Sequence, residues 1–323
     1  MSEKRDMYYN FDMIMPRLVD SFDHLDIEHA NSVLSSIEHN CLCIGTGGSN
    51  SVAHFASVVL EHVNGIIALS KEPREVIHMN LNDKHGYGKY RHLLGITYGN
   101  SNYGINEAKK MIEQSHLITT NSTSKSDICY KGSLPNERSF ISLASTIIPM
   151  SILLKYFLKA DKNELLDLMG KMYLNASEFE YDFNFNGETP LFEIMSGEDS
   201  YVASKVLEST IVEAGLGIPV VHEKYSYCHG RSTFTYHNKN SNLIYLINDE
   251  TNLDNHLLTV LKELYKNVVV IHSKENDYVI GEFDLALKSL FLCKIIAEQQ
   301  KKDLSRVEHY PNVKKLYYYD GGM

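Results

Sequence analysis

Short apolar runs alternate with stretches of helical spacing along this chain. Residues 10–38 carry helical periodicity, and the first apolar run, Cys41-Leu-Cys-Ile44, follows directly. Beyond it, apolar residues recur every three or four positions at Val52, Phe55, Val58, Val59 and Val63. The pattern predicts a buried strand that leads through a short turn into a helix.

Three more short apolar runs follow in the first half, at residues 65–69, 92–97 and 116–120. Each has the length of a strand, and polar or helical stretches separate them. Such alternation is typical of a parallel sheet with helices on both of its faces. A long helix from about Glu137 to Leu158 is predicted to close this half.

The second half repeats this order. Strands are predicted at residues 191–197, 218–221, 242–247 and 267–271, and a helix at 200–214. Residues 159–187 lie between the halves and are predicted to form a helix and then an Asn-rich polar connection. At 323 residues the chain also exceeds what one core usually serves. The sequence therefore predicts an α/β fold of two tandem three-layer αβα sandwiches with parallel sheets.

Charge and composition exclude several classes of protein. The formal charge is −10 and no Lys/Arg cluster stands out, so we expect no nucleic-acid partner. No run of about 18 apolar residues is present. The N-terminus also lacks the apolar core of a secretory signal, so we expect a cytoplasmic protein with no membrane partner. The five cysteines and fifteen histidines follow no ligand spacing, which favours reduced thiols and no metal or cofactor.

The first predicted strand ends in a glycine-rich turn, Gly45-Thr-Gly-Gly-Ser49. Backbone N–H groups at the start of the following helix, together with the helix dipole, can hold an anion there. Glycines let the backbone approach a ligand and hydroxyls add donors, which makes candidates of Thr46, Gly47, Gly48 and Ser49. A plain tight turn is the alternative. The loop lacks the lysine of a P-loop, and Asn50 stands where a dinucleotide fingerprint needs its third glycine.

A second polar loop, Thr97-Tyr-Gly-Asn-Ser-Asn102, follows the third predicted strand. In a doubly wound sheet this loop and the glycine loop lie at the same carboxyl edge, where ligands bind. Thr97, Ser101 and Asn102 are therefore candidates to donate hydrogen bonds to phosphate oxygens. The alternative is that these polar residues cap the next helix, since Ser and Asn are favoured at that position.

With these two loops and its duplicated halves, the chain resembles the sugar isomerase (SIS) domain family, and within it the double-SIS group. That group contains the isomerase half of glucosamine-fructose-6-phosphate aminotransferase and the fructosamine-phosphate deglycases. In the second half, Glu213 ends a predicted helix and His229-Gly230 follows sixteen residues later, as in the double-SIS enzymes. The segment Tyr310-Pro-Asn-Val-Lys-Lys-Leu316 is similar to the one that delivers a lysine to the family's active site. This lysine maps to Lys315, with Lys314 adjacent.

The resemblance implies how the chain is organised. It implies an N-terminal helical segment at residues 1–34, a first SIS-like domain at 35–165 and a second at 188–323 with a C-terminal active-site tail. It also implies a homodimer. The chain departs from the family where Arg231 replaces a frequent proline, and in the second loop, which is one residue shorter and contains Tyr98.

Roles for the site residues follow from the chemistry that the resemblance implies. Aldose–ketose isomerisation moves a proton between adjacent carbons, and a carboxylate such as Glu213 can act as base and then acid. The resemblance gives ring opening to His229, whose imidazole titrates near neutrality. A lysine such as Lys315 can hold an open-chain carbonyl electrostatically or as a Schiff base.

Two functions are predicted from these residues and from the resemblance. The first is a phosphosugar isomerase or deglycase that acts on an aminosugar phosphate or ketosamine phosphate through an enediol or enamine. The second is a catalytically silent SIS-type sugar-phosphate sensor that regulates a protein partner, and the unusual Tyr98 loop favours it. Both predict a small-molecule sugar phosphate as ligand.

Overall fold

The computed structural model describes residues 8–81, 90–99, 102–122, 124–137, 141–180, 185, 189–238 and 240–305. Within them the chain forms two compact units. The N-terminal unit consists of the described residues of 10–138 and 142–167, and the C-terminal unit consists mainly of those of 168–307. The domain limits implied by the resemblance stay a prediction.

The N-terminal unit is built on a parallel sheet. Its strands are β1 (Cys41–Ile44), β2 (Ala68–Lys71), β3 (His92–Ile96), β4 (Gln114–Thr119) and β5 (Ile128–Cys129). They pair in the order β2-β1-β3-β4-β5. The four strands predicted in this half are present, and β5 adds to them. Strand β2 begins at Ala68 and not at residue 65, because Gly65 ends the preceding helix in the left-handed conformation, with φ at 66°.

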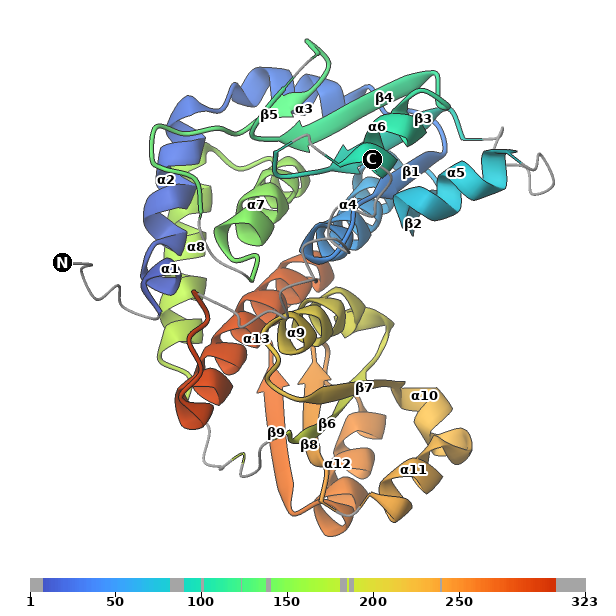
Figure 1. The fold of residues 1–323 in the computed structure, drawn as a ribbon, viewed down its shortest axis with the longest axis vertical. Helices are drawn as coiled ribbons and strands as arrows, with labels where there is room; N and C mark the ends of the chain where they lie inside the picture. The colour runs from blue at the N-terminus through green and yellow to red at the C-terminus, as the bar shows by residue number, and fades with distance from the viewer. Residues whose placement is uncertain are drawn as a thin grey trace, which may run out of the picture. The chain divides into compact units, whose positions relative to one another are not determined.

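Helices cover this sheet (Figure 1). The helices of this unit are α1 (Tyr9–Asp12), α2 (Ile14–His24), α3 (Ile27–Ser35), α4 (Gly48–Asn64), α5 (Pro73–Leu81), α6 (Tyr103–Lys109) and α7 (Ala144–Leu158), and α8 (Lys162–Ser177) begins in it. The chain passes from β1 out to β2 and then back to β3, and the right-handed crossovers usual for parallel strands put α4 and α5 on opposite faces when the direction reverses in this way. Val76 of α5 and Ile105 of α6 pack on Leu42 and other buried strand residues, whereas α4 packs against α7.

Helix α7 begins later than the apolar pattern predicts. The prediction places its start at about Glu137, but the helix begins at Ala144. The Glu137 carboxylate accepts hydrogen bonds from the backbone N–H groups of Leu143 (3.3 Å), Ala144 (3.2 Å) and Ser145 (2.9 Å). Glu137 therefore caps the first turn from outside the helix, a role that satisfies N–H groups with no partner inside it.

The C-terminal unit repeats the topology. Its strands are β6 (Leu191–Ser196), β7 (Ile218–Glu223), β8 (Asn242–Ile247) and β9 (Asn267–His272). They are parallel and pair in the order β7-β6-β8-β9, which matches β2-β1-β3-β4 of the other sheet. All four were expected from the apolar runs. The duplicated α/β architecture predicted from the sequence is therefore present.

Two layers of helices cover this second sheet (Figure 1). The short turn η2 (Glu198–Ser200) leads into α9 (Tyr201–Glu213), which packs against α13 (Tyr278–Gln300). The other elements are α10 (Lys224–Ser226), the π-helical turn η3 (Tyr227–Arg231), α11 (Ser232–His237) and α12 (Asn252–Leu264). Leu257 and Leu261 of α12 pack with Tyr227 of η3 on Leu243 and Tyr245 of β8, forming a core on one face.

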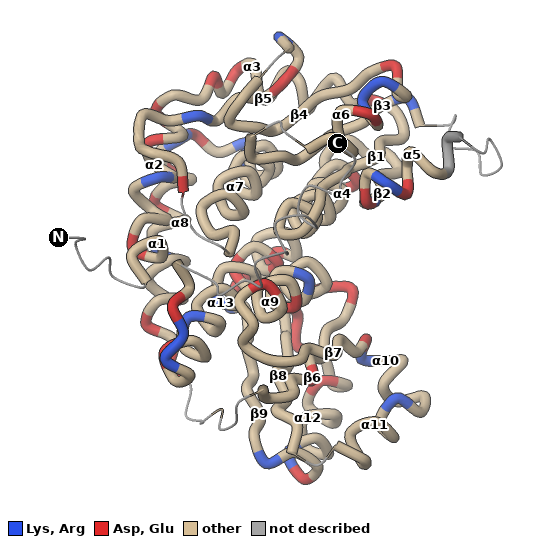
Figure 2. Tube along the Cα trace, viewed as in Figure 1, with Lys and Arg blue, Asp and Glu red and all other residues tan. Residues whose placement is uncertain are grey.

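Charged residues are spread over both units, with Lys and Arg interspersed among Asp and Glu (Figure 2). No broad basic face is visible among the described residues in this view, so an anionic ligand would have to be held by individual loops. Of the helices that the structure describes, none is both long enough and apolar enough to cross a bilayer.

Candidate functional site

Each sheet has a point where the strand order reverses. It falls between β1 and β3 in the N-terminal unit and between β6 and β8 in the C-terminal unit. Ligands of open parallel sheets bind outside the carboxyl ends of the strands at such a point. The loops that follow β1, β3, β6 and β8 are therefore the candidate ligand-binding loops of the two sheets.

The glycine loop after β1 has a backbone that only small residues permit. Gly47 has φ of 59° and ψ of −132°, a conformation that strains residues with a side chain. A Cβ on Gly48 would lie 2.9 Å from Cβ of Ser142, so the segment before α7 also packs on this loop. Gly47 is the N-cap of α4 and has no side chain with which to cap it. The positive end of α4 thus follows a loop shaped for close approach of a ligand.

The two candidate loops meet. The side-chain amide of Asn102 donates to Oγ1 of Thr46 over 3.3 Å. Oδ1 of Asn102 accepts from the backbone N–H of Ile105 at 2.9 Å, so the capping role considered for this loop holds for Asn102. Thr46 is exposed and Thr97 is buried. The expectation that both loops lie at one edge of the sheet is confirmed.

Ser49 and Ser101 are two further hydroxyl candidates in these loops. Ser49 is half-buried in the first turn of α4, where its backbone N–H donates to the Thr46 carbonyl at 3.2 Å. Ser101 lies outside the described residues, as does its neighbour Asn100. The hydroxyl that Ser101 would supply therefore stays a prediction.

Tyr98 is directed at the segment before α7. Its hydroxyl accepts from the backbone N–H of Glu137 at 3.0 Å, and its carbonyl accepts from the N–H of Thr120 at 2.9 Å. Burial raises the pKa of the Tyr98 hydroxyl and of the Glu137 carboxyl. Tyr98 is an anchored part of the structure, which explains how the short loop accommodates a large side chain.

A small cavity lies beside Tyr98. It is lined by Arg17 and Asp20 of α2, Tyr130, and Ala144 at the start of α7, among others. Its volume is about 30 Å³, which suits one or two water molecules and is too small for a sugar. This cavity is therefore not the substrate pocket.

Two hydroxyl residues near the glycine loop were not predicted from the sequence. Ser142 Oγ and Thr146 Oγ1 come within 3.1 and 3.4 Å of the Cβ position of Gly48. Ser142 lies just before α7 and Thr146 lies in its first turn, and Thr146 Oγ1 donates to the Ser142 carbonyl at 3.0 Å. The signal available was a helix start rich in hydroxyl residues, but the predicted helix began too early to single them out.

In the C-terminal unit the corresponding helix terminus is closed by the protein itself. The Glu282 carboxyl of α13 accepts from the backbone N–H groups of Val202 (3.0 Å) and Ala203 (3.1 Å), at the start of α9. Glu282 is fully buried, and burial raises its pKa to about 8. An internal carboxyl group thus takes the place that an anion could have at this helix.

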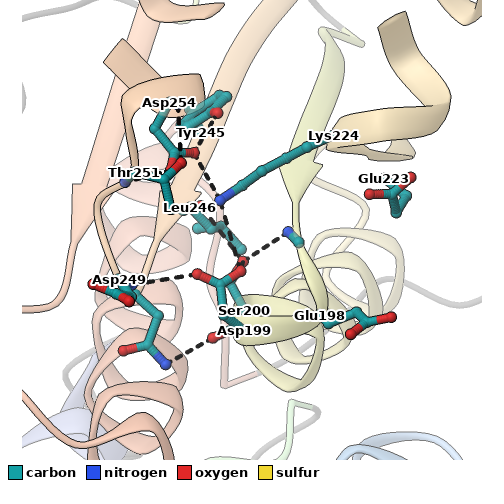
Figure 3. Close-up of polar contacts among 12 residues, drawn as sticks. Glu198, Asp199, Ser200, Glu223, Lys224, Tyr245, Leu246, Asp249, Thr251 and Asp254 are labelled. Atoms are coloured by element: carbon teal, nitrogen blue, oxygen red, sulfur yellow. Dashed lines mark hydrogen bonds and ion pairs between the residues drawn. The ribbon is translucent and has the colours of Figure 1, made fainter. Parts of the chain in front are cut away.

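An ion-pair cluster lies at the carboxyl edge of the sheet in the C-terminal unit (Figure 3). The buried ammonium of Lys224 lies 2.8 Å from Asp254 and 3.6 Å from Asp199, and 5.5 Å from the ring centre of Tyr245. Burial raises the pKa of Asp254, but Lys224 and the hydroxyls of Thr251 and Tyr245 outweigh it and bring the pKa to about 2. Of the two reversal points, the one in the N-terminal unit is therefore the better fit for an anion.

Glu213 is the last residue of α9, as predicted. Its side chain is half-buried and accepts a hydrogen bond from Ser209 Oγ at 2.9 Å. Burial raises the pKa of Glu213, and the bond from Ser209 opposes this only in part. A carboxyl group whose pKa moves toward neutrality is better suited to accept and return a proton.

His229 is exposed in η3, in the segment that follows β7. The backbone is kinked there, with φ of −99° and ψ of 38° at His229 and φ of 109° at Gly230. The positive φ explains the glycine after the histidine. Lys314 and Lys315 lie outside the described residues.

Comparison with known proteins places this fold. No family model matches the chain, and no curated protein matches it in sequence. Among solved structures, tagatose-6-phosphate ketose/aldose isomerase from Escherichia coli matches with a TM-score of 0.71 at 13% identity, over 94% of this chain and 96% of that one. The C-terminal domain of glucosamine-fructose-6-phosphate aminotransferase from Francisella tularensis matches at 0.64 and 11%, over 92% and 95%. Glucosamine-6-phosphate deaminase from Thermotoga maritima matches at 0.63 and 12%, over 92% and 97%.

These matches extend over nearly the whole chain and include both halves. The chain therefore has the double-SIS fold, and the resemblance inferred from the sequence is confirmed for the fold.

Proposed function

We propose that this protein binds a phosphorylated sugar and catalyses aldose–ketose isomerisation, or release of the amine from a ketosamine phosphate. The observation that carries the proposal is the cradle at the β1/β3 reversal point. There an uncapped helix terminus, a glycine loop and the Asn102–Thr46 contact come together in a double-SIS fold. Such a cradle suits the phosphate of a sugar phosphate.

The cradle would hold the phosphate through backbone N–H groups and hydroxyls. Gly47 and Gly48 allow the backbone to approach the anion, and Thr46 and Ser49 supply hydroxyl donors beside the start of α4. Thr97, Asn102 and the predicted Ser101 would complete it from the second loop. This role explains how a chain of charge −10 can select an anion.

Glu213 would carry the proton transfer. In isomerisation it removes the proton from the carbon next to the carbonyl, and the enediol that forms takes the same proton back at the neighbouring carbon. In a ketosamine phosphate the same transfer, from C1 to C2 through an enamine, gives an imine, and water hydrolyses this imine to the aldose phosphate and the free amine. The raised pKa of Glu213 supports this assignment. His229 would open the sugar ring and Lys315 would hold the open-chain carbonyl, as the resemblance implies.

Names among the structural matches support both versions of the reaction. One neighbour is a ketose/aldose isomerase, and another is a deaminase of an aminosugar phosphate.

We further propose a homodimer. Large aromatic side chains are exposed after β7 in the C-terminal unit, at Tyr225 (64%), Phe234 (37%) and Tyr236 (68%), and Ile218 (54%) is exposed at the start of that strand; a second copy would cover the aromatic side chains.

A silent sensor is the second candidate, and Tyr98 is the observation that favours it. The bond between its hydroxyl and the Glu137 backbone anchors the start of the second loop, and an anchored loop suits a protein that binds a ligand without converting it.

The test is a panel of hexose 6-phosphates and fructosamine 6-phosphates incubated with the protein in deuterated water. Proton NMR follows deuterium uptake at C1 and C2, and calorimetry follows binding. We expect uptake with at least one phosphorylated sugar and none with its unphosphorylated form. Binding without uptake would favour the sensor, and the absence of both would refute the proposal.

A further inference from the structure

One buried carboxylate ties together the segment that carries His229. Glu193 lies on β6 and is fully buried. Its Oε2 accepts from His222 Nε2 (3.0 Å), Thr235 Oγ1 (2.6 Å) and the Tyr265 hydroxyl (2.8 Å). Its Oε1 accepts from Ser241 Oγ at 2.5 Å. Four side chains from four parts of the C-terminal unit thus converge on one residue.

The hydroxyls around Glu193 also contact one another. The Thr235 and Tyr265 hydroxyls lie 2.7 Å apart, and the Tyr227 hydroxyl lies 2.9 Å from that of Thr235 and 3.3 Å from that of Tyr265. Burial raises the pKa of Glu193, but the bonds from His222, Ser241, Thr235 and Tyr265 outweigh it and lower the pKa. Glu193 is therefore an ionised carboxylate whose oxygens are saturated with donors.

The contacts close a loop around His229. Tyr227 stands two residues before His229, and Thr235 stands six residues after it. Both belong to the Glu193 network. Thr235 bonds to Glu193 directly, and Tyr227 is connected to Glu193 through its bond with Thr235. The ring of His222, which precedes the segment, packs edge-on against Tyr227 with ring centres 5.3 Å apart. Between the two anchors the kinked turn with His229 and Gly230 is exposed, as are Cys228, Arg231, Thr233 and Phe234.

We infer that Glu193 is a positioning residue that fixes His229 for its role in the reaction. The inference rests on the proposed function for the part that concerns turnover. A buried charge is costly unless it is paired and hydrogen-bonded, and a core on this face could be completed with apolar residues alone. Here the Glu193 carboxylate and its donors lie where Tyr227 and Thr235 anchor the segment that carries the exposed His229.

Two variants test this role. Glu193→Gln removes the charge. Thr235→Val conserves shape but removes the shorter of the two links between Glu193 and Tyr227, and leaves the longer one through Tyr265. Thr235→Ser restores the hydroxyl. Asp284→Asn is the matched control, because Asp284 is also buried in this unit but pairs with Lys288 of its own helix at 2.6 Å.

The first readout needs no turnover. Amide hydrogen exchange should become at least about tenfold faster over residues 224–238 in Glu193→Gln and Thr235→Val, and stay unchanged there in Asp284→Asn and Thr235→Ser. Should Glu193→Gln fail to fold, Thr235→Val decides. Equal exchange in Thr235→Val and the wild type would overturn the inference, whether or not the protein is an enzyme.

The second readout uses turnover of the sugar phosphate found in the panel. In folded Thr235→Val, kcat should fall about tenfold with KM within about twofold, and Thr235→Ser should recover it. Adding His229→Ala to Thr235→Val should cost no more than His229→Ala alone, since both act through one residue. Full additivity would overturn the positioning role. A wild type without turnover would refute the proposed function, while the exchange result would still decide whether Glu193 holds the segment.

Discussion

Asn102 donates a side-chain hydrogen bond to Thr46 across 56 residues of sequence, and this contact joins the two loops at the edge of the first sheet. The same side chain caps α6 through its oxygen. One residue therefore links the helix that follows β3 to the glycine loop that follows β1. Its two functional groups can be changed separately, which makes the cradle testable.

Asn102→Asp keeps an oxygen to cap α6 but removes the donor to Thr46 and adds a negative charge beside the phosphate. We expect affinity for the sugar phosphate to fall at least about tenfold, while stability changes by less than about 1 kcal/mol. Calorimetric titration and thermal unfolding measure the two effects. Unchanged affinity would show that the second loop takes no part in binding.

Gly47→Ala places a side chain where φ is 59° and ψ is −132°. We expect a loss of roughly 1–3 kcal/mol in the free energy of unfolding and loss of sugar-phosphate binding, because the loop must change shape to relieve the strain. Urea unfolding and titration provide the measurements. Gly170→Ala is the control: Gly170 lies inside α8 with open space around its Cβ position, so the change should stabilise by roughly 0.5–1 kcal/mol.

Glu282→Gln tests the internal cap of α9 through its pH dependence. Because the pKa of Glu282 is about 8 in the folded protein and the ordinary value is 4.5, the folded protein holds a proton that the unfolded chain releases. The stability this proton provides is full below about pH 4.5 and is lost as the pH rises toward 8. From pH 5 to 8 the wild type should lose roughly 1–3 kcal/mol of unfolding free energy relative to Glu282→Gln. A difference that stays constant, or grows in favour of the wild type, contradicts the assignment; urea unfolding at both pH values measures it.

The exposed aromatic side chains of α10 and α11 predict an oligomer. We expect the wild type to have the mass of a dimer in light scattering at micromolar concentration, and Tyr225→Ser with Tyr236→Ser to shift it to the monomer. Exposed apolar residues of α12 give the control, since Val260→Ser with Leu264→Ser should leave the dimer intact. A monomeric wild type would refute the homodimer.

The sequence predicted the architecture because its apolar runs are short and separated by well-formed amphipathic helices. Strand β8 was predicted at its full range of Asn242–Ile247, where all six residues are buried. The start of α7 was missed for a physical reason: residues 137–143 are apolar enough to continue the helical pattern, but the Glu137 carboxylate binds the helix terminus from outside.

Candidate site residues could be identified from the sequence only as far as local motifs reach. Gly47 and the end of α9 at Glu213 could be identified because their backbone requirements and their spacing are local. The Glu193 network was not predicted, since its donors come from His222, Thr235, Ser241 and Tyr265, and no local pattern links them. Convergence of distant side chains depends on tertiary packing, which spacing along one sequence does not encode.

The most direct test of the central claim compares Glu213→Gln with the wild type in deuterated water, using a sugar phosphate that both proteins bind. Glu208→Gln serves as the control, because Glu208 lies on the same helix but pairs with Lys205 near the surface. We predict that Glu213→Gln binds within about threefold of the wild type but takes up deuterium at C1 or C2 at least about 100-fold more slowly, and that Glu208→Gln matches the wild type. Uptake by Glu213→Gln at the wild-type rate would contradict the account.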